Sequence, residues 1–264
     1  MTPETQISGD DQKPSPELDA GQTARLARAR SKSLFIATPV ARHPVRQYTL
    51  AMVDTMLLLE RLKIRCQLQW VVGNSNIAAA RNELAAEFLA SDCSDMLFVD
   101  DDMGWKSKDV VRLLASDQDV IGGVGRKKTL MPDDRPDTWC VRLPTGDIEQ
   151  DDMGAIRALG VGTGFMKISR HAFERIAKAY PKLKRPGPDT MTAAARDNMF
   201  RFFQFTEDGG RVMSEDFAFC ELWRLLGESV WADPTIELVH VGDREFTGSF
   251  AALLQPAGQM EKIR

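Results

Sequence analysis

The chain has 264 residues, of which 43% are hydrophobic and 27% charged, and its formal net charge at pH 7 is -4. These values are typical of a soluble globular protein, and they exclude an overall basic field that would draw it to nucleic acid or membranes, although a local patch could still do so. No apolar run is long enough to span a bilayer, and the N-terminus lacks the apolar segment of a signal peptide. The widely spaced Cys66, Cys93, Cys140 and Cys220 contain no C-x-x-C pair, so we expect reduced thiols in a cytoplasmic protein rather than a disulfide framework or a zinc site.

The N-terminal segment is polar and acidic and contains several prolines. Residues 1–22 have almost nothing to bury, and the basic stretch "ARLARARSK" that follows fits a frayed helix or a solvated lead-in. We therefore predict a disordered tail over 1–30 and a single domain over 31–264, made of a nucleotide-binding half (31–125) and an acceptor half (126–250).

Strands and helices alternate in the first half. Strands are predicted at 34–38, 66–72, 95–100 and 119–125, and helices at 45–62, 75–91 and 108–116. Pro44 stands where the first of these helices can begin, Ser75 or Asn76 can cap the second, and Ser107 can cap the third. This rhythm predicts an α/β fold with a mostly parallel sheet flanked by helices. Ligands bind such sheets beyond the carboxyl ends of the strands.

The second half changes character and predicts a smaller, mixed or antiparallel portion. Shorter strands with glycine punctuation are expected at 138–144, 154–160, 164–169 and 200–205, helices at 171–180 and 214–227, and closing segments at 229–234 and 236–242. Residues 181–198 have little periodicity and three prolines, and they are long for a connection in a compact domain. We interpret them as a mobile lid or binding loop.

An acidic triplet, Asp100, Asp101 and Asp102, directly follows the apolar strand "MLFV". If the strand continues, Asp100 and Asp102 point the same way and Asp101 points the other way. Two carboxylates so placed suit Mg²⁺ or Mn²⁺, which take their remaining ligands from water and phosphates. The plainer interpretation is an acidic turn that caps the next helix.

Two further acids lie at a predicted helix start. Ser214 is a natural N-cap, which puts Glu215 and Asp216 in the first turn, where the helix dipole alone accounts for negative charge. The functional alternative is a carboxylate at the cleft that takes a proton from a hydroxyl. His240 ends an apolar strand, and a lone histidine there is more often structural than a ligand.

Arg81 and Asn82 lie in the first turns of the second predicted helix, where an arginine can pair with a phosphate or a nearby acid. The glycine-rich "IGGVGRKK" and "GVGTGF" fit neither a phosphate-binding P-loop nor a dinucleotide fingerprint. They indicate tight bends or backbone that approaches a ligand. Lys127 and Lys128 could contact phosphate, although a solvated pair is the commoner outcome.

Taken in order, these features resemble the nucleotide-sugar glycosyltransferases of the GT-A fold, and most closely their bacterial and phage members. "FIATPV" is similar to the nucleotide-base loop, "AARN" to the uridine- or diphosphate-contacting motif, and "FVDDDM" to the D-x-D signature. "GVGTGFMKISRHAFERI" is similar to the acceptor-site floor and "SEDFAFCELWRLLG" to the E-D helix. "VWADPTIELVHVG" is similar to a pattern of related bacterial and phage proteins. The resemblance covers about residues 33–245, and its ordered set is specific although no single motif is.

The resemblance implies a Rossmann-like GT-A fold and assigns roles to residues. The nucleotide-sugar-binding residues would be Thr38, Pro39, Arg81, Asn82, Asp100, Asp101, Gly123 and Gly164. The metal ligands would be Asp100, Asp102 and His240, and the catalytic residues Asp216, as the base, and Glu215. The triplet leaves open whether Asp100 or Asp101 is the partner of Asp102.

The implied activity is a metal-dependent hexosyl transfer from a nucleotide-sugar, expected to be a UDP-sugar, to an acceptor hydroxyl. Mn²⁺ or Mg²⁺ would neutralise the departing diphosphate, with Arg81 or Lys127 sharing the task. Asp216 as base predicts inversion, and retention follows if it only orients the acceptor. The acceptor could be a hydroxymethylated base in phage DNA, in the host cytoplasm, or a glycan or protein. Basic segments such as "PKLKR" favour DNA, and the acidic isoelectric point counts mildly against it.

Two other functions fit parts of the sequence. "LFVDDDM" also resembles the first motif of haloacid-dehalogenase-like phosphatases, with Asp100 as nucleophile and Asp102 as acid and base. That family carries the motif on its first strand, and the later acidic pair is supplied only by Asp243 and Glu245, which are poorly spaced. An inactive sugar-nucleotide-binding module ranks last, because all the expected acids are present.

Overall fold

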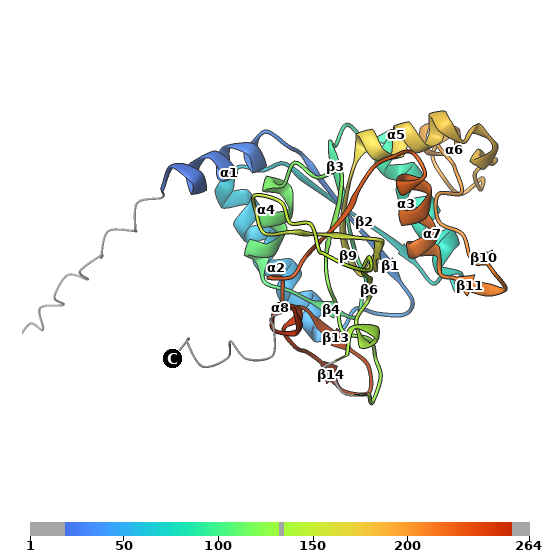
Figure 1. Cartoon of the computed structure of the whole chain (residues 1–264). Coiled ribbons are helices and arrows are strands. Elements are labelled where there is room, and N and C mark those ends of the chain that lie inside the picture. The colour runs from blue at the N-terminus through green and yellow to red at the C-terminus, as the bar shows by residue number, and fades with distance from the viewer. Residues whose placement is uncertain (1–18, 132–134, 255–264) are drawn as a thin grey trace, which may run out of the picture.

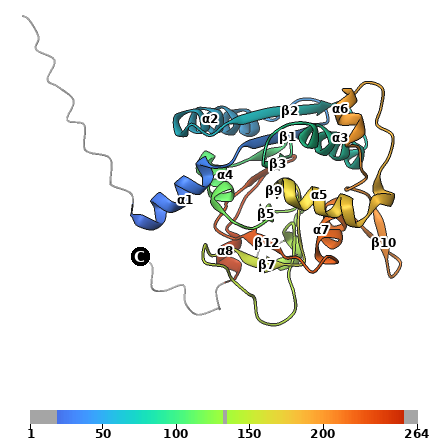
Figure 2. The same ribbon diagram turned by 90° about the horizontal axis from the view of Figure 1, so that it is seen from above.

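The computed structural model describes residues 19–131 and 135–254, and these are built around one seven-stranded sheet. Figure 2 shows its strands in spatial order, from β2 at the top to β7 at the bottom. In that order they are β2 (Cys66–Val72), β1 (Leu34–Val40), β3 (Asp95–Val99), β9 (Phe165–Ser169), β5 (Val120–Gly123), β12 (Val230–Asp233) and β7 (Ile156–Ala158). Only β9 and β7 run against the other strands, so the sheet is mostly parallel.

Helices cover both faces of this sheet (Figure 1). One face carries α1 (Ala20–Arg30), α2 (Arg46–Leu62) and α4 (Ser107–Ala115), and the other carries α3 (Ile77–Ala90), α5 (Arg170–Ala179) and α7 (Glu215–Arg224). Because side chains alternate along a strand, Leu34 and Ile36 of β1 join the core under α2, while Phe35 and Ala37 join the core under α3. The inner strands of the sheet are therefore buried on both sides, as their apolar sequences require, whereas the edge strand β2 is mostly exposed.

Small antiparallel sheets and short helices complete the described residues. The sheets are β14–β13–β4 (Glu245–Phe246, Val239–Val241, Met103–Gly104), β10–β11 (Thr206–Asp208, Arg211–Met213) and β6–β8 (Val141–Arg142, Gly160–Val161). The short helices are η1 (Pro136–Thr138), η2 (Pro181–Leu183), α6 (Ala193–Asp197) and α8 (Phe250–Leu253). The predicted fold class is confirmed: the arrangement is consistent with a Rossmann-like GT-A fold. Because the second half of the chain supplies β9, β12 and β7, both predicted halves share one sheet.

The predicted disorder is wrong for residues 20–30, which form α1. Asp19 caps this helix in a capping box with Gln22, and the Arg28 guanidinium donates to the Ala115 carbonyl at 3.0 Å. The sequence did not predict an ordered helix here, because its apolar face is small and is buried only by packing against α4. Residues 1–18 of the predicted tail lie outside the described residues. Within residues 19–131 and 135–254, we find no helix with both the length and the apolar character needed to cross a bilayer.

Three local predictions also need correction. The aromatic stretch 200–205 does not form a strand: Phe203 is buried and stacks on Phe219 at a centroid distance of 4.8 Å, and its backbone is bonded to the Asn82 side chain. Ser107 begins α4 rather than capping it, because Lys106 is the N-cap. The predicted loop 181–198 contains η2 and α6, and a role as a lid stays a prediction.

Candidate active site

A small cavity of about 80 Å³ lies where β3 and β5 end and β9 begins. Its polar and glycine lining comes from segments far apart in the sequence, and it comprises Arg81, Asp100, Gly123, Gly125, Cys140, Gly162, Gly164, Asp216 and His240. Met103, Phe165 and Leu238 supply its apolar part. The cavity lies at the carboxyl edge of the sheet, where ligands bind in open α/β folds. Six of the residues singled out by the sequence meet there: Arg81, Asp100, Asp216, His240, Gly123 and Gly164.

Arg81 is the buried centre of the polar cluster. One of its terminal nitrogens, Nη2, donates to both carboxylate oxygens of Asp100, at 2.8 and 3.0 Å, and Nη1 pairs with Glu215. The side chains of Arg81 and Glu215 are only 4% and 6% exposed, whereas that of Asp100 is 26% exposed. Asp100 therefore faces the cavity and Glu215 lies behind Arg81. Glu215, which was predicted to be catalytic, thus pairs with Arg81 and does not line the cavity.

The acidic triplet does not behave as a continued strand. β3 ends at Val99, a turn follows, and the Met103 amide donates to the Asp100 carbonyl at 3.1 Å. Asp100 turns towards Arg81, while Asp101 accepts from the Ala41 amide at 2.9 Å on the other face of the sheet, and burial raises the pKa of Asp101. Asp101 therefore joins the loops after β1 and β3, and it does not line the cavity.

Asp102 lies between Lys128 and His240. Its Oδ2 pairs with the Lys128 ammonium, and its Oδ1 is buried and accepts no hydrogen bond, with His240 Nε2 3.5 Å away. Burial favours a higher pKa for Asp102, but His240 and Lys128 outweigh it and hold that pKa below its ordinary value. Lys128 was expected to be solvated more often than bound, and the neighbouring Lys127 instead donates to the Asp137 carbonyl at 2.9 Å.

The tautomer of His240 is fixed by its other nitrogen. Nδ1 lies 2.7 Å from the Arg126 carbonyl, which can only accept, so Nδ1 carries the proton. When the ring is protonated, Nε2–H faces Oδ1 of Asp102, and this is the form that lowers the pKa of Asp102. In the neutral ring, Nε2 instead presents a lone pair towards Oδ1, which accepts no hydrogen bond. An imidazole nitrogen and a carboxylate oxygen that face each other in this way are suitable ligands for a divalent cation. Metal-binding histidines usually donate their other ring N–H to a carbonyl, as His240 does here.

No complete metal site is formed by the side chains as they stand. Across residues 19–131 and 135–254, no three of the His, Cys, Asp and Glu side chains are grouped as ligands of one ion. Asp100 is the predicted third ligand, and it is held by Arg81 on the other side of the turn. Asp102 and His240 fit a cation, and Asp100 could join them only by leaving Arg81.

Asp216 is half-buried, and it has the geometry of a base at the cavity. It stands in the first turn of α7, where its Oδ1 accepts from the Ser214 hydroxyl and, at 2.8 Å, from the Phe217 amide. Its Oδ2 lies towards Gly162, where an added methyl group would be only 3.5 Å from it. One oxygen is thus anchored, and the other lines the cavity. The glycine at 162 keeps this space open, and its motif was noted in the sequence without that role.

Two predicted nucleotide-binding residues are occupied elsewhere. Thr38 is fully buried, and its hydroxyl lies 2.7 Å from that of Tyr48. Asn82 is 4% exposed and bonds the backbone of Phe203 in both directions, at 2.8 and 2.9 Å. Pro39 is buried in β1. None of these three residues lines the cavity, so the predicted direct contacts with a nucleotide have no support in these positions.

Of the two predicted glycines, Gly123 allows a close approach, whereas a side chain at Gly164 would meet its neighbours at ordinary contact distances. A methyl group on Gly123 would come within 2.6 Å of Ile236, and one on Gly164 would lie 3.5 Å from Asp100 Oδ2. The Gly164 carbonyl accepts from the Asp100 amide at 3.1 Å. Cys140, which the sequence did not single out, also lines the cavity, and burial raises the pKa of its thiol to about 11.

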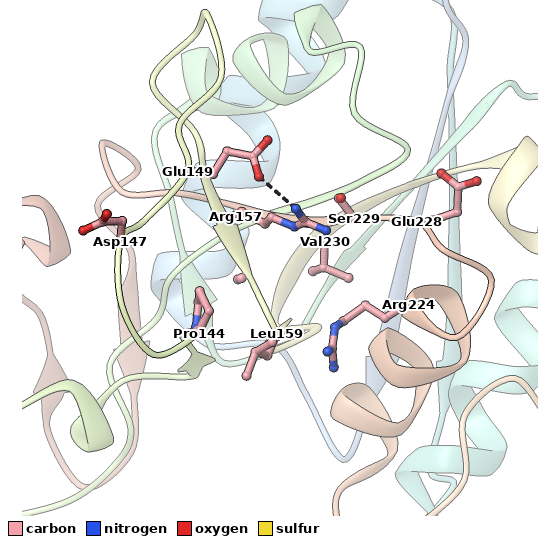
Figure 3. A pocket seen from close by; sticks show the side chains of 10 residues that line it. Pro144, Asp147, Glu149, Arg157, Leu159, Arg224, Glu228, Ser229 and Val230 are labelled. Carbon is pink, nitrogen blue, oxygen red and sulfur yellow. Dashed lines mark hydrogen bonds and ion pairs between the residues drawn. The ribbon is translucent and has the colours of Figure 1, made fainter.

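A second cleft, of about 260 Å³, lies beside the edge strand β7 (Figure 3). Its arginines are already paired: Arg157 with Glu149, as the dashed line shows, and Arg224 with Glu221. The cleft lies at the start of β12, away from the carboxyl edge that carries the acidic turn. It has none of the unsatisfied groups of the first cavity, so we do not assign it chemistry.

The chain was compared with known proteins. No family model matches it, and no curated protein matches it. Among solved structures, one match is described as the crystal structure of a glycosyltransferase involved in the glycosylation of the major capsid of PBCV-1. The match has 11% sequence identity and a TM-score of 0.29, and it covers 62% of this chain and 72% of that one. At so low a TM-score the match carries no weight for fold or activity, and the functional conclusion depends on the residues of this chain.

Proposed function

We propose that this protein is a glycosyltransferase that moves a sugar from a nucleotide-sugar, most simply a UDP-sugar, to an acceptor hydroxyl with inversion. One observation carries the proposal: Arg81, Asp100, Asp216 and His240, which come from four separate segments, line one cavity at the carboxyl edge of the sheet. A single cavity thus offers a base, an arginine and acidic groups suited to a cation. Sugar transfer needs all three, because a proton leaves the acceptor while negative charge builds on the diphosphate.

The base is Asp216. Its Oδ1 is held by Ser214 and the Phe217 amide, so the carboxylate cannot rotate freely, and Oδ2 is left to take the proton of an acceptor hydroxyl. Glu215 acts indirectly by holding Arg81 against Asp100. A base on the face of the sugar opposite the diphosphate gives inversion of the anomeric centre.

The residues that would hold a divalent cation are Asp102 and His240, with Asp100 joining on donor binding. The unsatisfied Oδ1 of Asp102 and the lone pair of His240 Nε2 support this assignment. Bound Mn²⁺ or Mg²⁺ would act as a Lewis acid towards the diphosphate. Arg81 would offer Nη2 to a phosphate oxygen in place of Asp100, while Nη1 stays paired with Glu215.

The phosphatase alternative loses support at two positions. Both oxygens of Asp100 accept from Arg81, which makes Asp100 a poor nucleophile. Asp243 and Glu245 are exposed outside the cavity, and Glu245 is bonded to Gln47. A phospho-aspartyl intermediate on Asp100 would restore that alternative.

The decisive experiment is a thermal-shift screen of nucleotide-sugars with and without Mn²⁺, because a ligand that binds the folded state raises its stability by mass action. We expect one nucleotide-sugar to raise Tm only when Mn²⁺ is present, and slow release of its sugar in the absence of an acceptor. Asp102→Asn should abolish both effects, whereas the exposed Asp243→Asn should change neither. No response to any nucleotide-sugar would contradict the proposal.

The class of acceptor can be determined by measuring how the affinity for the acceptor changes with salt concentration. A DNA acceptor would bind through phosphates, so its affinity should fall steeply as salt rises, by about a thousandfold or more between 50 and 200 mM for six or more contacts. A neutral glycan should hardly respond. The net charge of -4 leads us to expect the weak response, and thus a glycan or protein acceptor.

A further inference from the structure

The exposed apolar side chains of this protein are concentrated on two neighbouring elements. Twelve large hydrophobic residues are exposed in the described parts of the chain, and six of them lie on α2 and the edge strand β2: Leu50, Val53, Leu57, Leu68, Trp70 and Val72. Figure 2 shows α2 beside β2 at the outer end of the sheet. A concentration of this kind on a soluble protein marks an interaction surface. None of the six lines the candidate active site.

The helix part of this surface has a regular spacing. Leu50, Val53 and Leu57 follow a 3–4 repeat on the face of α2 opposite its buried residues, which include Tyr48, Met52 and Leu59. A second helix fits against an apolar stripe of this kind through side chains at the same spacing. The repeat continues by one position at each end, to the exposed Arg46 and Glu60.

The ends of the stripe therefore carry opposite charges. If two α2 helices pack antiparallel about a two-fold axis near Val53, Leu50 of one copy lies opposite Leu57 of the partner subunit. Arg46 of one copy then lies opposite Glu60 of the partner subunit, and the same pair forms again on the other side of the axis. A two-fold interface requires a self-complementary surface of this kind. A parallel arrangement would place like charges together.

The strand part extends the apolar surface towards the edge of the sheet. Leu68, Trp70 and Val72 pair in register with Ile36, Thr38 and Val40 of β1, so they point to the same face of the sheet as α2. Trp70 confirms this direction, because its indole donates to the Tyr48 hydroxyl of α2 at 3.1 Å. These side chains widen the surface beside the helix stripe, as an interface of standard size requires.

We propose that this protein forms a two-fold dimer through antiparallel packing of α2 on α2, flanked by the exposed face of β2. The occupant of the surface is a second copy of the chain, because the charges at the two ends of the stripe complement each other only between antiparallel copies. The dimer is independent of the proposed glycosyltransferase function, and either can fail without the other.

Sedimentation velocity on the full chain, over a dilution series, tests the dimer. We expect a mass of twice the 29.5 kDa chain and dissociation on dilution. Leu57→Glu should weaken the dimer at least a hundredfold, because it puts a charge opposite the apolar Leu50 of the partner subunit, twice in each dimer. Leu225→Glu is the matched control, since Leu225 is equally exposed, at 65% against 66%, but lies at the end of α7. It should leave the dimer unchanged. Tm is measured for both, to show that each folds.

Charge reversal tests the antiparallel register itself. Arg46→Glu alone, or Glu60→Arg alone, should weaken the dimer about tenfold, because each creates two like-charge contacts across the axis. The double variant Arg46→Glu with Glu60→Arg should restore it. A monomeric wild-type chain at all concentrations, a dimer that survives Leu57→Glu, a dimer lost in Leu225→Glu, or a double variant no tighter than the singles would each overturn the proposal.

Discussion

An acid lies at each end of β3 and is paired with a positively charged side chain, yet the two acids differ in their access to solvent. At the start of the strand, Asp95 lies 3.4 Å from Lys167 Nζ and 3.6 Å from Lys32 Nζ, and the side chains of Asp95 and Lys167 are only 3% and 1% exposed. At its end, Asp100 is paired with Arg81, but its side chain is 26% exposed and lines a cavity. One cluster is sealed and the other is open.

The difference shows that a buried ion pair is not in itself a functional signal. The Asp95 cluster is closed by backbone: Lys167 donates to the Gln118 carbonyl at 2.6 Å, and Lys32 to that of Ser116 at 3.0 Å. The Asp100 cluster is closed on one side only, by Glu215. A ligand can replace Arg81 as the partner of Asp100, whereas no ligand can reach Asp95. The first cluster contributes to the fold, and the second is free to exchange partners.

The largest expected effect is the loss of activity in Asp216→Asn. The amide oxygen can still accept from Ser214 and Phe217, but its nitrogen replaces the oxygen that would take a proton. The rate of sugar transfer should fall by about 10²–10⁴, the usual contribution of general base catalysis, with Tm unchanged. Asp95→Asn should do the opposite, lowering Tm without changing the rate per folded molecule. If Asp216→Asn lowers only the affinity for the acceptor, Asp216 orients rather than deprotonates it.

Replacing Arg81 with Met should affect both stability and activity. It leaves Glu215 buried and ionised without a partner, which costs about 3–5 kcal/mol of the free energy of unfolding. Adding Glu215→Leu removes that charge, so urea unfolding of the double variant should regain most of the lost stability. Activity should stay low in both, because the arginine proposed to pair with the phosphate is missing. Recovery of activity in the double variant would show that Arg81 does not act at the site.

Much of the fold was predictable, because local patterns determine its strands and helices. β2 is found over 66–72 as predicted, and Asn76 caps α3 through a hydrogen bond to the Ala79 amide at 3.2 Å. The antiparallel insertion of β9 between β3 and β5 was not predicted, since strand order depends on contacts between distant segments. The aromatic segment 200–205 misled the prediction: its strand-forming residues fill a core instead of joining a sheet.

The sequence predicted which residues meet at the candidate active site, but not which side chains they pair with. Arg81, Asp100, Asp216 and His240 were expected to meet, and they line one cavity. The sequence could not show that Glu215 supports Arg81, because two adjacent acids at a helix start look equivalent until the helix is packed. It also could not show that the turn after Val99 separates Asp100 from Asp102. Both outcomes depend on how elements pack, which no spacing rule encodes.

The cluster of Asp95, Lys167 and Lys32 at the start of β3 predicts that the stability of the fold depends on pH. Burial lowers the pKa of Lys167 to about 8, from the ordinary lysine value of 10.5. Between these values the unfolded chain holds a proton that the folded chain has lost, so the free energy of unfolding rises with pH. The gain should reach about 3 kcal/mol across the window, at about 1.4 kcal/mol per pH unit. Urea unfolding of the wild type and of Lys167→Met isolates the contribution of Lys167 to the free energy of unfolding. The contributions of the other lysines are common to both proteins and cancel when the two free energies are subtracted. If the free energies of unfolding of the wild type and Lys167→Met differ by the same amount at pH 7.5 and pH 10.5, the lowered pKa of Lys167 is contradicted.

The smallest expected effect concerns the cation site proposed after the end of β3, and it is a change in the affinity for Mn²⁺. His240→Gln keeps a donor for the Arg126 carbonyl but removes the imidazole that faces Asp102 Oδ1. The apparent affinity for Mn²⁺, read from the rise in Tm with Mn²⁺ concentration, should fall about tenfold, or about 1.4 kcal/mol. His171→Gln makes the same replacement at an exposed histidine that packs against Trp223, and it should leave the affinity unchanged. Equal affinities in the wild type and both variants would show that a cation does not lie between Asp102 and His240. The open end of β3 would then differ from the sealed end in access alone, and not in the exchange of ionic partners.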